Sequence, residues 1–62
     1  MICRDERDPR VAEAKRLLGF GVIDDLFDRE LEQRLRGVQL VYKLVPHGQL
    51  DKATMAVIGV SQ

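Results

Sequence analysis

The stretch RELEQRLRGVQLVYKLVPHGQLDKATMAVI, residues 29–58, decides the fold of this chain. In its first half, apolar side chains recur at helical spacing and form one stripe: Leu31, Leu35, Val38 and Tyr42. Charged side chains turn away from this stripe: Arg29, Glu32, Arg36 and Lys43. The pattern therefore predicts an amphipathic helix over residues 29–43, which we expect to be the longest element and the centre of the core.

Gly37 lies inside this predicted helix. A glycine in a helix interior costs about 1 kcal/mol relative to alanine. We expect its backbone to lie in close contact with a neighbouring element, with simple tolerance as the alternative.

A turn follows the predicted helix. Val45 precedes Pro46, which biases Val45 toward extended geometry and ends the helix. His47 and Gly48 then form the turn, for which Gly48 supplies a positive φ angle. The chain must therefore reverse its direction here.

A short last helix is predicted over residues 52–58, with Asp51 as its N-cap and Gly59 at its end. A helix of this length is unstable alone in water, so tertiary packing must hold it. We expect its apolar contacts to come from these positions: Ala53, Met55, Val57 and Ile58.

Upstream of residue 29, Asp8 and Pro9 are a strong signal for the start of a helix. The Asp8 carboxylate can accept a hydrogen bond from a free backbone N–H of the first turn, and Pro9 has no N–H that would need a partner. The apolar stripe of this first helix is Val11, Ala14, Leu17 and Leu18. Gly19 and Gly21 end it. In the loop that follows, we expect these residues to fold inward: Val22, Ile23, Leu26 and Phe27.

These elements predict an all-α protein, a small orthogonal three-helix bundle formed by a single domain over residues 8–60. Residues 1–7 mix charges without periodicity, so we expect a disordered, charged N-terminal lead-in. A domain of 62 residues buries only about 60% of its unfolded surface, so its stability margin is thin.

Composition argues against several function classes. Ten Lys and Arg balance ten Asp and Glu, so no global field draws the chain to nucleic acid or to an anionic membrane. Cys3 is the sole cysteine and His47 the sole histidine, which leaves no metal-ligand spacing and no Cys/His nucleophile pair. The acidic residues near Asp24 lack the glycine and the glutamate of a calcium loop. We expect no enzyme, no cofactor and no metal.

Several positions in the deciding stretch keep the spacing of a pattern that reads Thr-x-x-Ala-Val-x-x-Phe-Gln, a Leu, a Gly, and Asp-x-x-Thr-x-x-x-Leu. These positions are Leu31, Arg34, Leu35, Val38, Gln39, Leu44, Gly48, Asp51, Thr54 and Ile58. Upstream, the first helix and its end keep further positions: Val11, Ala14, Leu18, Gly19 and Phe20. Over residues 11–58 the chain thus resembles the peptidoglycan-binding-like domain, a three-helix module.

The chain departs from that family at three positions: Lys15 replaces Gln, Asp28 replaces the second Gly of the loop, and Leu31 replaces the capping Thr. Asp28 can itself cap the second helix in place of the missing Thr. The resemblance implies attachment to bacterial cell-wall peptidoglycan, often as a non-catalytic appendage of a hydrolase.

We predict a shallow groove near the end of the second helix and the 46–49 turn that contacts glycan or stem peptide. Glycan recognition needs an aromatic face with donors and acceptors around it, which makes Gln39, Tyr42, His47 and Gln49 the candidate ligand-binding residues. Each also has a structural interpretation: Gln39 can bond the backbone of a loop, Asp51 with Thr54 can cap a helix, and Tyr42 can pack its ring.

The alternative is a small protein–protein interaction module, such as a phage-encoded or bacterial accessory protein. A chain that begins at Met1 without an enzyme, a linker or an export signal favours this alternative. We expect the bacterial cell wall as its location if the binding hypothesis holds, and the cytoplasm otherwise.

Overall fold

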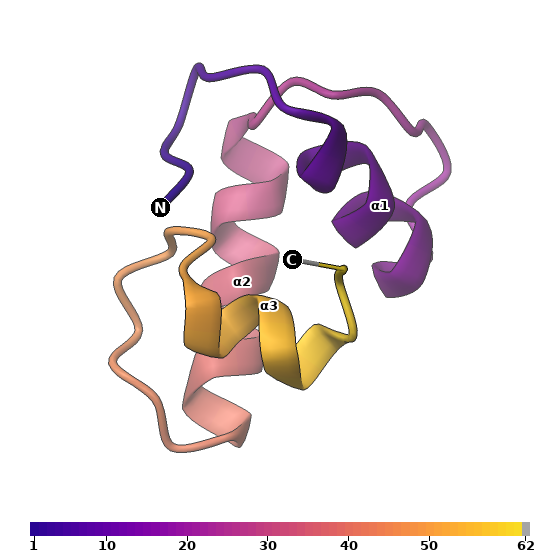
Figure 1. The fold of residues 1–62 in the computed structure, drawn as a ribbon. Coiled ribbons are helices and arrows are strands. Elements are labelled where there is room, and N and C mark those ends of the chain that lie inside the picture. The colour runs from indigo at the N-terminus through magenta and orange to yellow at the C-terminus, as the bar shows by residue number, and fades with distance from the viewer. Residues whose placement is uncertain (62) are drawn as a thin grey trace.

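The computed structural model describes residues 1–61 and contains three helices, which Figure 1 shows as α1 (Pro9–Leu18), α2 (Arg29–Val41) and α3 (Lys52–Ile58). Over these residues the structure has no strand, only isolated bridges between Ile2 and Leu50 and between Arg7 and Leu26. The prediction of a small all-α protein with three helices is therefore confirmed. No helix within residues 1–61 has the length and apolar character that crossing a bilayer requires.

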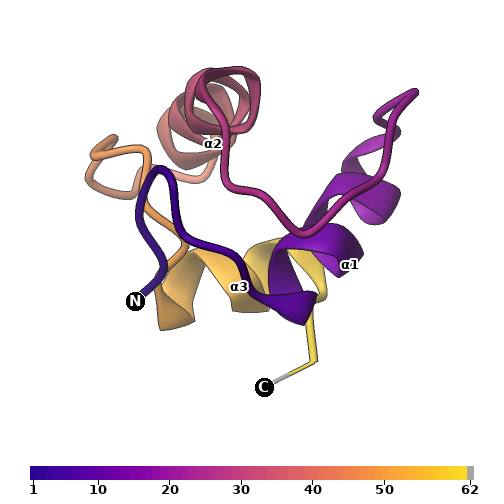
Figure 2. The same ribbon diagram turned by 90° about the horizontal axis from the view of Figure 1, so that it is seen from above.

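The shortest helix, α3, packs against both α1 and α2. Figures 1 and 2 show α3 running crosswise to α2, with α1 toward the C-terminal end of α3. A seven-residue helix has too few hydrogen bonds to persist alone, so its contacts with both partners hold it in place.

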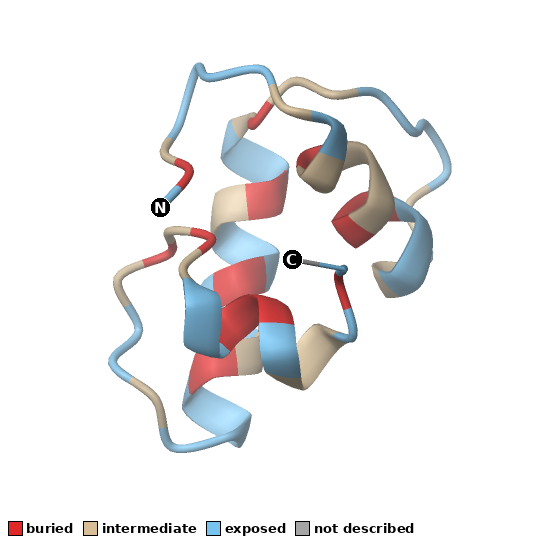
Figure 3. Cartoon of the chain, in the orientation of Figure 1, coloured by how far each residue is buried: buried red, intermediate tan, exposed pale blue. Residues whose placement is uncertain are grey.

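The core draws on the helices, on the segments between them and on the two terminal segments (Figure 3). The helices contribute Val11, Ala14, Leu31, Leu35 and Met55. The other segments contribute Ile2, Phe27, Leu50 and Val60. The expected stripes are therefore confirmed at their centres, whereas Leu17, Tyr42 and Ala53 at their edges are exposed.

The aspartates expected at the helix starts cap all three helices. Asp8, Asp28 and Asp51 accept hydrogen bonds from the backbone N–H groups of Arg10, Leu31 and Thr54, respectively. Gly19 and Gly59 end α1 and α3 in the left-handed conformation, as predicted.

The second helix is shorter than predicted. It ends at Val41, Tyr42 forms its C-cap, and Lys43 has a positive φ of 58°. The Leu44 N–H donates to the Gln39 carbonyl at 2.7 Å, which turns the chain back two residues before the predicted end.

The N-terminal segment differs from the expected disordered lead-in. Ile2 is only 2% exposed and exchanges two backbone hydrogen bonds with Leu50. Phe27 is likewise paired with the backbone of residues 5 and 6. The charged residues concealed this role because the single apolar anchor, Ile2, has no periodic partners nearby in the sequence.

The loop between α1 and α2 follows the prediction only in part. Phe27 is fully buried, but Val22 and Ile23 face the solvent. The Asp8 N–H donates to the Asp25 carbonyl at 3.0 Å, and Lys15 binds Asp24. These two bonds hold the loop backbone in a path that turns Val22 and Ile23 outward.

Candidate functional site

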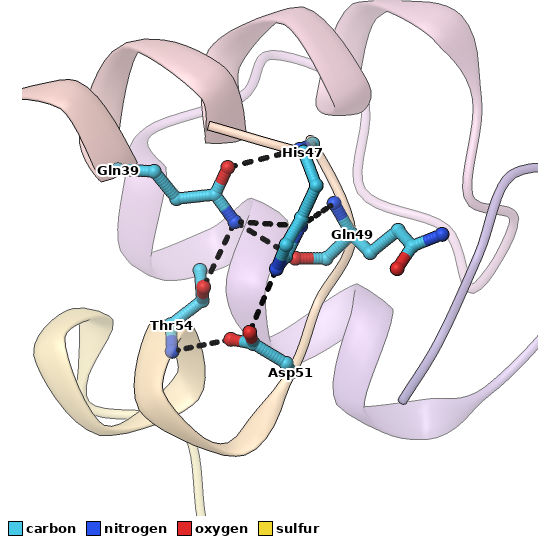
Figure 4. Close-up of polar contacts among 6 residues, drawn as sticks. Gln39, His47, Gln49, Asp51 and Thr54 are labelled. Carbon is cyan, nitrogen blue, oxygen red and sulfur yellow. Dashed lines mark hydrogen bonds and ion pairs between the residues drawn. The ribbon is translucent and has the colours of Figure 1, made fainter. Parts of the chain in front are cut away.

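Gln39 is the centre of a buried polar cluster that joins α2 to the following loop and to α3 (Figure 4). Its Oε1 atom accepts a hydrogen bond from the Gly48 N–H at 2.9 Å. Its Nε2 atom donates to the Gln49 carbonyl and to the Thr54 hydroxyl, each at 2.9 Å. Because Gln39 is fully buried and its amide is engaged within the protein, it holds the loop and does not face a ligand.

His47 completes the cluster from the turn. Its Nδ1 atom accepts from the Gln49 N–H at 2.9 Å, which requires the proton of the neutral ring to lie on Nε2. The Nε2–H group of His47 donates a hydrogen bond to Asp51 Oδ2 at 2.8 Å. Both ring nitrogens of His47 are thus used to hold the turn against the start of α3.

Asp51 has two roles in this cluster, because its other oxygen, Oδ1, accepts from the Thr54 N–H at 2.8 Å. Hydrogen bonds from Thr54, with a smaller contribution from His47, lower the pKa of Asp51 to about 2, although partial burial acts in the opposite direction. The predicted capping pair of Asp51 and Thr54 is confirmed.

Gly48 brings the turn against the surface of α2. Its φ is +77°, as predicted, and an added Cβ would lie 2.8 Å from the Glu32 Cγ atom. Neither the conformation nor the space admits a side chain here.

Tyr42 lies apart from this cluster. It is 55% exposed and lines an open hollow of about 610 Å³, which we name the α2 groove. The polar residues of the α2 groove are Glu30, Gln33 and Arg34. Its remaining residues are Gly37, Val38, Val41 and Tyr42. The candidate residues are therefore divided: Gln39, His47 and the backbone of Gln49 form the buried cluster, and Tyr42 belongs to the groove.

Arg34 places a positive charge in the α2 groove. It donates one hydrogen bond to the Leu18 carbonyl at 3.1 Å, and its guanidinium carbon lies 5.3 Å from the centre of the Phe20 ring. Among residues 1–61, no carboxylate pairs with it. These contacts orient the side chain and leave donors for a ligand.

Sequence reasoning missed Gln33 and Arg34 as groove residues. In the sequence, Arg34 was noted only as a position of the family pattern, and Gln33 was given no role. The available signal was helical spacing, because residues 30, 33, 34, 37, 38 and 41 lie three or four positions apart and so share one face of a helix. Gly37 lies on this face, and a Cβ built on it meets no atom of another segment within 4 Å among the described residues, so the predicted close packing at Gly37 is wrong.

A second buried polar side chain, Lys15, lies far from the groove. It is 1% exposed, and its Nζ atom contacts Asp24 at 2.5 Å and Asp28 at 3.0 Å. Burial acts to lower the pKa of Lys15, but the two carboxylates outweigh it, so the pKa is raised and the amine stays charged. Lys15 holds the loop between α1 and α2, and its amine is not exposed to a ligand.

Within the described residues, no group of three potential metal ligands comes together. Comparison of the chain with models of known protein families, with curated proteins and with solved structures found no match. The function is therefore inferred from the surface of the molecule.

Proposed function

We propose that this chain is a non-catalytic binding module that takes a fragment of bacterial peptidoglycan, glycan or stem peptide, in the α2 groove. The observation that carries the proposal is the exposed ring of Tyr42 in an open hollow that also holds the Gln33 amide and the Arg34 guanidinium. An amphipathic aromatic ring offers a packing face for a sugar, and the polar groups offer the directional contacts that fix its orientation.

The polar cluster around Gln39 supports this proposal indirectly. The Gln39 side chain fixes residues 48 and 49, and the Gln39 backbone carbonyl accepts from the Leu44 N–H two residues after Tyr42, so the chain that follows the groove is held at both points. The resemblance to the peptidoglycan-binding-like domain adds a ligand class to the groove. The positions that carry this resemblance most clearly, Gln39, Gly48, Asp51 and Thr54, serve the fold.

A binding role is favoured over catalysis by the setting of the groove. Its polar side chains, Glu30, Gln33 and Arg34, are all exposed to solvent. A general acid or nucleophile is usually desolvated and held by a partner so that its reactivity is tuned.

Co-sedimentation with insoluble cell-wall sacculi tests the proposal. We expect the wild-type protein to pellet with sacculi and the Tyr42→Ala variant to lose most of this binding. The control is Val22→Ala, which shortens an exposed apolar side chain outside the groove. Equal sedimentation of the wild type and an unrelated small protein would refute the ligand assignment.

A protein partner is the second candidate, favoured by exposed aliphatic side chains beside the groove. Leu40 and Val45 are 64% and 73% exposed and take no part in the groove or the buried cluster. A Leu40→Ser, Val45→Ser double variant distinguishes the two functions. It should bind sacculi like the wild type if the ligand is glycan, whereas it should lose its partner if these residues form a protein interface.

A further inference from the structure

The N-terminal segment is bound to the rest of the molecule at two separate places. Residues 5–8 pair with residues 25–27, in the loop between α1 and α2, through backbone hydrogen bonds of 2.8 to 3.0 Å. Ile2 pairs with Leu50 just before α3, and Figures 1 and 2 both show the N-terminus beside the chain that enters this helix. The segment therefore bridges two loops that are far apart in the sequence.

The contact between Ile2 and Leu50 has the form of an extended peptide docked on a backbone edge. The Ile2 N–H donates to the Leu50 carbonyl at 3.1 Å, and the Leu50 N–H donates to the Ile2 carbonyl at 2.9 Å. The Ile2 side chain is 2% exposed and belongs to the core, whereas Met1 is 70% exposed. One pair of backbone hydrogen bonds and one apolar side chain thus form this anchor.

The site that receives Ile2 is held in shape by other residues. On one side of Leu50, the Gln39 side chain binds the backbone of residues 48 and 49. On the other side, Asp51 caps α3 through the Thr54 N–H. The backbone groups of Leu50 therefore keep their place when Ile2 leaves them.

A strained turn joins the two anchors of the segment. Arg4 and Asp5 form this turn, and Asp5 has a φ of 72°, in the left-handed region that is unfavourable for residues other than glycine. The side-chain contacts of the turn lie at the surface. The Cys3 N–H donates to the Glu6 carboxylate at 2.9 Å, and the Arg4 guanidinium lies 3.6 Å from the Glu32 carboxylate. Exposed contacts of this kind stabilise little, so straightening the turn relieves strain and loses little in return.

We propose that this turn opens and that Ile2 then docks on Leu50 of a second copy, whose own Ile2 docks in return. The occupant is a second copy because that copy carries the segment which the structure shows in the site. The exchanged dimer keeps the contacts of the Ile2 anchor and relaxes both turns. This interaction goes beyond the proposed function and needs no ligand in the α2 groove.

The closed monomer competes with the exchange. A short linker holds Ile2 near its own Leu50 at an effective concentration on the order of millimolar. The dimer should therefore form as the protein concentration approaches that value.

Sedimentation of the full chain over a range of concentrations, together with NMR of mixed labelled and unlabelled chains, tests the exchange. We expect a monomer at micromolar concentration and a dimer at about 1 mM. In the dimer, an isotope-filtered NOE should join Ile2 of one copy to Leu50 of the other. A monomer at every concentration refutes the proposal, and so does a dimer that lacks this intermolecular contact.

Three substitutions of Asp5, which is exposed, locate the hinge. Asp5→Val disfavours the left-handed conformation and should tighten dimerisation about tenfold, whereas Asp5→Gly adopts it freely and should weaken dimerisation about tenfold. Asp5→Asn is the matched control, because it removes the charge but tolerates a positive φ, and it should dimerise like the wild type. Equal dimerisation of Asp5→Val and Asp5→Gly would overturn the opening of this turn.

Discussion

The loop between α1 and α2 and the loop between α2 and α3 are each anchored by one buried polar side chain from the preceding helix. Lys15 of α1 holds the first loop through the carboxylates of Asp24 and Asp28. Gln39 of α2 holds the second through backbone groups and the Thr54 hydroxyl. In both loops the last residue is an aspartate that caps the next helix.

The difference between the two anchors lies in their partners. The carboxylates that bind Lys15 remain 45% and 37% exposed, so water can solvate them if the amine is removed. The groups that bind Gln39 include the buried N–H of Gly48 and the buried hydroxyl of Thr54, which water does not reach. The neutral anchor should therefore matter more to stability than the charged one.

The largest effect is expected from Gln39→Leu. This change leaves the Gly48 N–H, the Gln49 carbonyl and the Thr54 hydroxyl without their partner, and should cost about 3 kcal/mol of unfolding free energy. A domain of this size has only several kcal/mol in total, so the variant should lose a large share of its stability while still unfolding cooperatively. Urea denaturation followed by circular dichroism measures the loss. Gln49→Ala is the control, since only its backbone joins the cluster.

A smaller effect is expected from Gly48→Ala, which tests the geometry of the second loop. The positive φ alone should cost about 1 kcal/mol, and the contact with Glu32 Cγ should add about as much again. Gly59→Ala is the matched control, because Gly59 also has a positive φ but an added Cβ there meets nothing within 4 Å. Equal losses of unfolding free energy in the two variants would show that the turn does not press against α2.

Lys15→Met should destabilise the protein by about 1 kcal/mol at low salt, and by less at high salt, where the ion pairs are screened. The methionine keeps the apolar part of the buried side chain, so the loss reports the charge. Gln39→Leu should show no such salt dependence. A salt-independent loss in Lys15→Met would indicate that the two loops are held by the same kind of interaction.

Mild acid should have the smallest effect. The pKa of Asp51 is about 2 in the folded protein, compared with an ordinary value of 3.8. The stabilisation that its carboxylate gives is therefore complete above about pH 4 and disappears as the pH falls through about 2. The contribution of Asp51 to the unfolding free energy should therefore be lost as the pH falls from about 4 through about 2. Asp51→Asn, which can still cap α3, should weaken this dependence. An identical acid profile in the variant would assign the transition to other carboxylates.

Local signals were enough to predict much of the fold. Asp8 with Pro9, Asp28 and Asp51 marked the helix starts because a cap is a contact within a few residues of the chain. The role of Gln39 in holding a loop also followed from its position before the turn. Its simultaneous assignment to a ligand failed, because a sequence does not show whether an amide has hydrogen bonds left to offer a ligand.

Other features depended on contacts between distant residues. Ile2 appeared to belong to a charged lead-in, and only its pairing with Leu50 makes it part of the core. In the sequence, Lys15 was noted only because it replaces the Gln of the family pattern. Its buried ion pairs depend on the path of residues 24–28. The groove was predicted between the end of the second helix and the 46–49 turn, but the α2 groove is lined by residues 30–42 and by no residue of that turn, and its polar residues were not predicted.

The order of residues by itself determined where the three helices begin, which faces of α1 and α2 are apolar, and where the chain turns, because these properties depend on neighbours within one or two helical turns. Only the tertiary structure decided that the N-terminal segment joins the core and that Gly37 faces solvent. It also decided that the Gln39 side chain is buried, whereas the Tyr42 side chain is exposed. Burial is a property of the whole assembly, since each of these side chains is covered or left bare by segments far away in the sequence.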